Sequence, residues 1–169
     1  MTAALKETLP KLPSFERIVA DTTADLYRLA VRLTGDPAEA RDVLQNTYLH
    51  AFEALKAGRF RGECRLETWL YRIVMHTAFD ARRADQRRTR LREAAPAGEA
   101  PAQSEASVEL SELRSALETL PADQRSALVL KELHGLSGRE TAAVMERSEG
   151  SVEQLLVRAR AELRRRFER

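Results

Sequence analysis

The chain has 169 residues, of which 43% are hydrophobic, 32% charged and 5% aromatic. This composition suits a chain that folds in water, and the low aromatic content argues against a β-sandwich or barrel and for helices. The single cysteine, Cys64, excludes a disulfide framework or a cysteine-based zinc site within one chain. No apolar run approaches 18 residues and no signal segment begins the chain, so we expect a reduced, cytoplasmic protein without direct membrane insertion.

The first predicted elements are two helices that meet at a short turn. Apolar residues recur at mostly helical spacing over residues 15–33, and Gly35 is expected to end that helix. Asp36-Pro-Ala-Glu39 predicts a new helix start, because the aspartate oxygen accepts from an orphan amide and proline has no amide hydrogen to leave unpaired. This second helix should run to about residue 57, where Gly58 supplies a left-handed cap.

The next segments differ sharply in charge. A loop with two glycines over residues 58–66 precedes a predicted helix over 67–92. Residues 72–92 hold seven arginines against two aspartates, a net charge of +5, whereas residues 93–112 hold five glutamates and no lysine or arginine, a net charge of −5. The acidic stretch is rich in Ala, Pro, Ser and Gly and cannot bury a core, so we predict a flexible acidic linker over 93–106.

A second helical block follows the predicted linker. Its helices are expected over residues 108–120, around 128–133, over 137–146 and from 148 toward the C-terminus. Ser137-Gly-Arg-Glu140 has the pattern of a capping box, and Ser148 is a further N-cap. Two helices joined by a few residues have the proportions of a helix-turn-helix. The last 23 residues hold seven arginines and four glutamates, a net charge of +3.

The sequence therefore predicts an all-α chain of two small domains, each ending in an arginine-rich helix. Arginine clusters on otherwise balanced domains indicate a polyanionic partner, because phosphate contacts supply most nonspecific nucleic-acid affinity. The alternative is a solvated helix face with salt bridges. The predicted helix-turn-helix favours DNA, because such motifs place their second helix in the major groove.

In their order along the chain, several motifs resemble those of the extracytoplasmic-function (group IV) sigma factors of bacterial RNA polymerase. The resemblance covers roughly residues 22–92 and 107–167. The motifs that carry it are Leu26-Tyr-Arg-Leu-Ala-Val-Arg-Leu-Thr-Gly-Asp-Pro37, Ala40-Arg-Asp-Val-Leu-Gln-Asn-Thr-Tyr-Leu-His-Ala-Phe52, Phe60-Arg-Gly, Thr68-Trp-Leu-Tyr-Arg-Ile73, Leu117-Glu-Thr-Leu-Pro121, Gly135-Leu-Ser137, Glu149-Gly-Ser-Val152 and Arg158-Ala-Arg160.

This resemblance implies a domain organisation and a set of partners. Residues 1–13 would be a flexible N-terminal tail, residues 14–92 a region 2 helical bundle and residues 107–169 a region 4 helix-turn-helix domain. The chain would bind core RNA polymerase through the β-prime clamp helices and the β flap, melt and capture the −10 element, and read the −35 element of promoter DNA. An anti-sigma factor would control it, and neither a cofactor nor a small-molecule substrate is implied.

The resemblance also assigns residues to each of these contacts. Core polymerase would meet one face of the second helix, comprising Asp42, Gln45, Asn46, Leu49 and Glu53. The −10 DNA would meet Arg59, Phe60, Arg61, Arg72, His76, Arg82, Arg83, Arg87 and Arg88. The −35 DNA would meet Arg139, Ser151, Glu153, Gln154, Val157, Arg158 and Arg160.

Physical chemistry supports parts of this assignment. An exposed leucine such as Leu49 among polar groups is a plausible partner patch, although an ordinary solvated helix face is the alternative. Phe60 lies in a basic, glycine-flanked loop, and such an aromatic ring can stack on an unpaired base. Trp69 has apolar neighbours and is expected in the core. His76 stands where members of the family often carry asparagine, and Glu153 and Leu155 stand where they often carry lysine or arginine.

The sequence offers no catalytic site. The histidines His50, His76 and His134 share no metal-ligand spacing with one another or with Cys64. Two further functions stay open besides a sigma factor. A sigma-like mimic would sequester an anti-sigma factor without recognising a promoter, and a stand-alone helix-turn-helix repressor would need only the second domain.

Overall fold

The computed structural model describes residues 12–92, 112 and 115–168, and in this part of the chain every regular element is helical. The predicted N-terminal tail and acidic linker fall on residues 1–13 and 93–106, which lie almost wholly outside the described residues. The helices, in chain order, are α1 (Phe15–Thr34), α2 (Pro37–Lys56), α3 (Leu66–Arg92), α5 (Ala122–Leu128), the π-helical turn η1 (Val129–Leu133), α6 (Gly138–Met145) and α7 (Glu149–Phe167).

The turn between α1 and α2 forms as its sequence predicts. Gly35 adopts a left-handed conformation, with φ at 76°, and its amide donates to the Val31 carbonyl at 2.7 Å. The Asp36 carboxylate accepts from the amides of Ala38 and Glu39 at 2.7 and 2.9 Å. These bonds satisfy donors that have no partner within the helix, and they fix where α2 begins.

Helices α1, α2 and α3 pack against one another around one part of the core. On α2 the buried residues recur at helical spacing, as predicted, so that a single face of the helix is covered. These buried α2 residues are Ala40, Val43, Thr47 and Ala51, and Leu44 and Leu55 are partly buried beside them.

The second group consists of α5, η1, α6 and α7. The predicted capping box is present at α6, where Ser137 and Glu140 each bond the backbone of the other. Ser148 caps α7, and the buried stripe of α7 comprises Val152, Leu156 and Ala159. The π-helical turn was not predicted. In it the amide of His134 donates to the Val129 carbonyl five residues earlier, at 2.7 Å.

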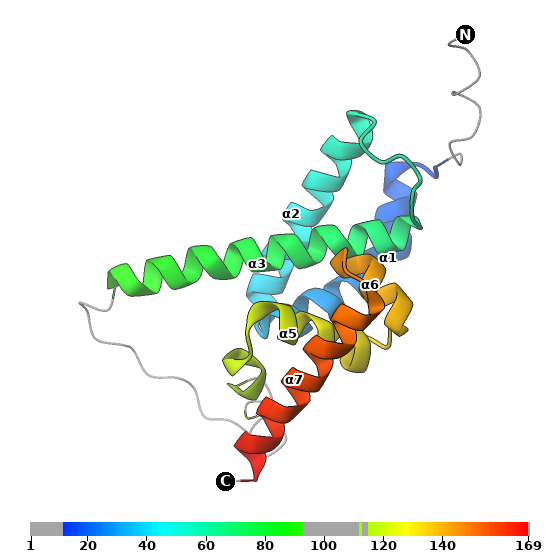
Figure 1. Ribbon diagram of the computed structural model, residues 1–169. Coiled ribbons are helices and arrows are strands. Elements are labelled where there is room, and N and C mark those ends of the chain that lie inside the picture. Colours follow the sequence, from blue (N-terminus) through cyan, green and yellow to red (C-terminus); the bar gives the residue numbers. More distant parts are fainter. Residues whose placement is uncertain (1–11, 93–111, 113–114, 169) are drawn as a thin grey trace.

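The two groups of helices touch each other. Helix α3 packs against α6, and α1 packs against η1. Figure 1 shows α3 as a long helix that crosses over the α5–α7 group and extends beyond it at its C-terminal end. In this structure the chain is therefore closed, meaning that the α1–α3 group contacts the α5–α7 group.

Candidate functional site

The outer face of α2 is exposed and mixes polar with apolar side chains. All five residues predicted to meet core polymerase are exposed, and Leu49 keeps 53% of its surface accessible. The structure adds Phe52, which is 46% exposed and packs edge-on against Phe15 with ring centroids 5.1 Å apart. Phe52 was not among the residues predicted for this face, although it lies three residues after Leu49 and therefore shares its helix face.

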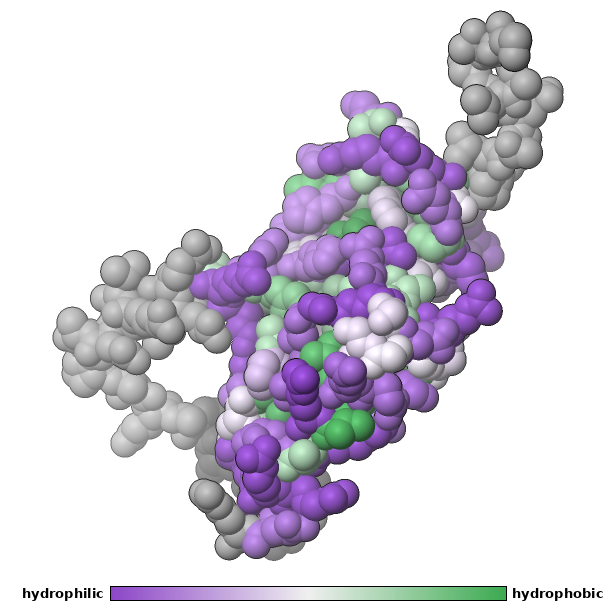
Figure 2. Space-filling model, in the orientation of Figure 1, coloured by the Kyte–Doolittle hydropathy of each residue, from purple (hydrophilic) through white to green (hydrophobic). Residues whose placement is uncertain are grey.

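Among the described residues, five large apolar side chains are exposed, and Leu49 and Phe52 are the two that lie within one turn of the same helix. The face of the molecule in Figure 2 is mostly hydrophilic, with small and separate apolar areas. Large apolar side chains that stay exposed together on one helix mark interaction sites more often than isolated ones do. Leu49 and Phe52, bordered by Gln45, Asn46 and Glu53, form such a patch, which we call the α2 patch.

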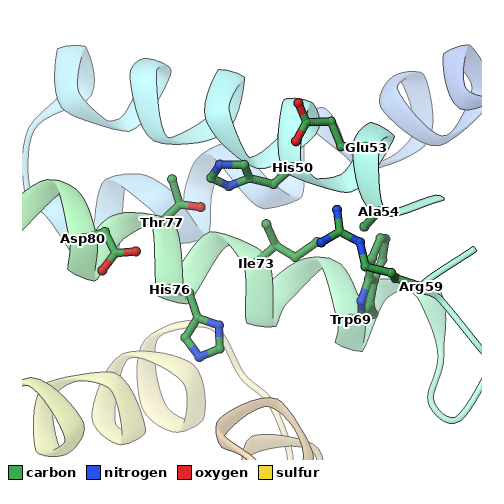
Figure 3. Close-up of a pocket in the computed structure, with 9 residues that line it drawn as sticks. All are labelled: His50, Glu53, Ala54, Arg59, Trp69, Ile73, His76, Thr77 and Asp80. Atoms are coloured by element: carbon green, nitrogen blue, oxygen red, sulfur yellow. The ribbon is translucent and has the colours of Figure 1, made fainter. Parts of the chain in front are cut away.

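A groove of about 400 Å³ lies between the C-terminal half of α2 and the first half of α3 (Figure 3). It combines the aromatic ring of Trp69 with hydrogen-bonding side chains, both acidic and basic. The residues that line it are His50, Glu53, Ala54, Arg59, Trp69, Ile73, His76, Thr77 and Asp80.

Arg59 and His76, two residues predicted to meet −10 DNA, both line the groove, and Figure 3 shows the His76 ring pointing away from Arg59 and His50. The size of the groove lies in the range of small-ligand sites. An indole ring offers a stacking surface, and carboxylates and imidazoles offer acceptors and donors to the edge of a planar heterocycle. The arrangement is therefore suited to an unpaired nucleobase. Trp69 is only partly buried, so it lines the groove as well as packing on the core.

The structure corrects the prediction for Phe60. Its side chain is only 8% exposed and packs against Trp69, with ring centroids 4.9 Å apart. An apolar ring gains more from this contact than from water, so the loop turns Phe60 inward while Arg59 and Arg61 stay exposed. In this conformation Phe60 supports the wall of the groove and does not present its ring to a base.

Arg72 also differs from its prediction as a free DNA contact. Its Nε donates to the Ala143 carbonyl at 2.9 Å and its Nη1 lies 3.0 Å from Glu146 Oε1, both at the C-terminal end of α6. The two groups of helices share this arginine because a carbonyl at a helix C-terminus and a carboxylate are both acceptors for guanidinium.

The other predicted −10 arginines lie further along α3. Arg83 is exposed, whereas Arg82 is half-buried and faces Arg125 of α5. Burial, together with the positive charge of Arg82, lowers the pKa of Arg125 to about 10. The side chains of Arg87 and Arg88 lie outside the described residues.

The predicted DNA face of α7 is largely open to solvent. Gln154, Val157 and Arg158 are exposed and lie at spacings that place them on one side of the helix. Arg160 is also exposed but is paired, with Nη2 2.5 Å from Glu132 Oε1 and Nη1 3.7 Å from Glu153 Oε1. Of the remaining predicted residues, Arg139 is exposed on α6 and Ser151 is half-buried.

The described residues offer neither a metal site nor a membrane-spanning helix. No group of three or more His, Cys, Asp or Glu side chains there could hold a metal ion. None of the helices in that part of the chain is long and apolar enough to span a membrane.

Comparison with known families matches most of the chain. The family model described as "Sigma-70 region 2" matches residues 18–88 and that described as "Sigma-70, region 4" matches residues 110–163. The first match contains most of α1, all of α2 and the groove, and the second contains α5, α6 and most of α7.

Individual proteins agree with these matches. The chain is 36% identical to the ECF RNA polymerase sigma factor SigM of Mycobacterium tuberculosis over 155 residues, covering 90% of this chain and 76% of that protein. Among solved structures it resembles CnrH in complex with the cytosolic domain of CnrY, with 27% identity, a TM-score of 0.67 and coverage of 91% and 87%. It also shares the fold of the sigma factor RpoE in complex with the anti-sigma factor NepR from Bartonella quintana, with 24% identity, a TM-score of 0.69 and coverage of 93% and 98%.

Proposed function

We propose a mechanism from one premise: this chain belongs to the extracytoplasmic-function group of RNA polymerase sigma factors, within the sigma-70 family. It is an alternative sigma factor that binds core RNA polymerase and directs promoter-specific initiation of transcription. The observation that carries the mechanism is that α2 presents an exposed, partly apolar patch on one face and borders a base-sized groove on another.

The α2 patch is the surface we assign to the β-prime clamp helices of the polymerase. Leu49 and Phe52 supply apolar area, and Gln45, Asn46 and Glu53 border them with hydrogen-bonding groups, with Asp42 further along the same helix. Such a patch, with an apolar centre and a polar rim, has the usual anatomy of a protein interface. The α5–α7 group would meet the β flap.

The groove between α2 and α3 is the place we assign to one unpaired base of the −10 element. A base leaving the duplex loses stacking and pairing, and it regains both against Trp69 and the polar groups of the groove. Arg59, Arg61 and Arg83 would contact the backbone around it, which positions the DNA without reading its sequence.

The exposed face of α7 is the one we assign to the −35 duplex. Gln154 can pair with adenine, Glu153 can accept from cytosine, and Arg158 can bond guanine or a phosphate. The pairing of Arg160 with Glu132 and Glu153 directs that arginine toward the protein, so its share of DNA binding is smaller than that of Arg158.

Regulation and location complete the proposal. We propose that an anti-sigma factor binds this chain and holds it inactive, which is supported by the RpoE structure that shares its fold, a complex with the anti-sigma factor NepR. The chain itself supplies binding surfaces, and catalysis and cofactors belong to the polymerase. It would act in the cytoplasm, where polymerase and promoter DNA are.

The test is a selection of DNA by the assembled holoenzyme. Purified chain and core polymerase are mixed with a pool of genomic fragments, and bound fragments are recovered and sequenced. We expect enrichment of fragments that share two short motifs. The motifs should lie about 25 base pairs apart, which is the distance between the −35 and −10 elements. A His76→Ala variant should relax the choice of base at one position of the downstream motif only.

Two outcomes would contradict the proposal. Polymerase binding without enrichment of any fragment indicates a sigma-like mimic. Enrichment of one motif by the chain alone, with no dependence on polymerase, indicates a helix-turn-helix repressor.

A further inference from the structure

A cluster of polar side chains lies between the two groups of helices. His134 follows η1, and its side chain is only 4% exposed. It meets Asp25 and Arg32 of α1 and Tyr71 of α3, whose ring packs edge-on against the imidazole with centroids 5.2 Å apart. We call Asp25, Arg32, Tyr71 and His134 the interdomain cluster.

The contacts fix the protonation state of His134. An Arg32 Nη1 lies 3.0 Å from His134 Nδ1, and a guanidinium only donates, so Nδ1 must accept. The ring proton therefore resides on Nε2, which lies 3.4 Å from Asp25 Oδ2. The neutral ring satisfies both neighbours at once. A second proton, on Nδ1, would point at the arginine and break that bond.

We propose that the interdomain cluster is a pH-sensitive switch, which keeps the chain closed while His134 is neutral and releases the two groups of helices when His134 is protonated. The π-helical turn η1 is what places the ring there, since it sets the backbone position of His134. Insertions of this kind in a helix recur at functional sites.

The charged groups around His134 favour its neutral form while the chain is closed. The groups that face it are Asp25, Arg28 and Arg32 from α1 and Tyr71 from α3. Burial lowers the pKa of His134, the charge of Asp25 opposes this, and the charges of Arg32 and Arg28 lower the pKa further, so that it lies below its ordinary value.

The other ionisable groups of the cluster titrate outside the physiological range. Hydrogen bonds from Tyr71 and Arg28 outweigh the effect of burial and leave the pKa of Asp25 below its ordinary value. Burial and the Asp25 carboxylate raise the pKa of Tyr71. Between pH 8 and pH 5.5, His134 is therefore the member of the cluster whose charge changes.

The consequence for activity rests on the proposed function. Elements about 25 base pairs apart are separated by about 85 Å of DNA. A domain of about 75 residues has a radius of gyration of about 11 Å, so two domains in contact cannot occupy both elements. Closure also keeps Arg72 bonded to α6 and away from DNA. The closed chain is therefore unable to bind a complete promoter.

The test measures opening directly, without polymerase or DNA. In the full chain with Cys64→Ser, donor and acceptor dyes are attached to cysteines placed at the exposed Lys56 of α2 and the exposed Ala161 of α7. Energy transfer then reports the opening equilibrium. An imidazole in water titrates near pH 6.5, so a proton that the open form binds and the closed form excludes raises the opening constant at pH 5.5 relative to pH 8 by at most about 10-fold.

Variants separate this switch from a merely structural contact. His134→Phe keeps a ring against Tyr71 but has no nitrogen, so it should be more open at pH 8 and show no pH response. Arg32→Met should reduce the pH response, because Nδ1 could then take a proton beside Asp25. His50→Phe and His76→Phe, in the groove, should respond to pH as the parent does, and circular dichroism confirms that each variant is folded.

The proposal is overturned if energy transfer in the parent is unchanged from pH 8 to 5.5, or if His134→Phe retains the full pH response. Failure of the proposed function would appear elsewhere, as a lack of promoter selection in a chain that still opens with acid.

Discussion

At the scale of single residues, arginines that look equivalent in the sequence have different contacts in the structure. The arginines of α3 all counted toward one basic cluster, yet among the three whose side chains the structure describes, Arg72 is bonded to α6, Arg82 faces Arg125 and Arg83 is exposed. Charge counting identifies a polyanion-binding segment, but it cannot say which guanidinium meets another part of the same chain. That depends on how the two groups of helices pack.

Aromatic side chains also have surroundings that differ from those predicted. Phe60 was predicted to be exposed because its loop is basic and contains two glycines. Trp69, nine residues later, was predicted to lie in the core. The two rings satisfy each other, so Phe60 is buried and Trp69 is left partly accessible. Phe52 was overlooked because periodicity marks apolar residues as core, although its spacing from Leu49 places it on the outer face of α2.

The first prediction concerns the α2 patch. Leu49→Asp and Phe52→Asp should each weaken binding of the chain to core polymerase by about 10-fold or more, because each replaces apolar contact area at an interface with a charge that must be desolvated. Fluorescence anisotropy of labelled chain measures the dissociation constant.

Arg41→Ala on the same helix is the matched control and should change the dissociation constant much less, because exposed Arg41 lies about two helical turns before Leu49 and adds no apolar area to the patch. Equal losses in all three variants would mean that binding depends on the general stability of α2 rather than on this surface.

At the scale of elements, local sequence rules accounted for most of the fold. Asp36, Ser137 and Ser148 cap the helices that they were predicted to cap, and the buried stripe of α2 follows the predicted spacing. The π-helical turn could not be predicted, because the pattern of residues 128–133 is equally typical of an ordinary helix, and the turn depends on backbone bonds such as that from His134 to Val129.

The second prediction tests how α2 begins. Asp36→Ala removes the acceptor for two amides, and we expect the free energy of unfolding to fall by about 1 kcal/mol. The melting temperature should decrease by about 3 °C in a calorimetric scan. Asp36→Asn retains a capping oxygen and should recover most of the loss. If the two variants melt together, the charge of Asp36 and not its hydrogen bonds stabilises the helix.

At the scale of the whole molecule, two groups of helices with separate surfaces are closed against each other. The sequence indicated two domains and two arginine-rich helices, and it left their relative position open because no pattern within either domain encodes it. Contacts between α3 and α6 and between α1 and η1 determine that position in the structure. Under the mechanism we propose, those contacts break before the chain binds a promoter, because the two promoter elements are far apart.

The third prediction concerns the dependence of promoter binding on salt. Each arginine that neutralises a phosphate releases counterions, so the logarithm of affinity should fall linearly with the logarithm of salt concentration. Arg83→Ala should reduce that slope by about 1 and weaken all promoters alike. Gln154→Ala should leave the slope unchanged and alter the preference for one base. A change of slope in Gln154→Ala, with none in Arg83→Ala, would reverse the roles we assign to α3 and α7.

The central claim, that this chain is a sigma factor whose α2 patch engages the polymerase, is tested most directly by single-round transcription. Core polymerase, a selected promoter and the chain are mixed, and the run-off transcript is quantified with the parent chain, Leu49→Asp and Arg41→Ala. We predict a transcript with a defined start that requires the chain, is lost with Leu49→Asp and persists with Arg41→Ala. A transcript that forms equally without the chain, or none with any chain that binds polymerase, would contradict the claim.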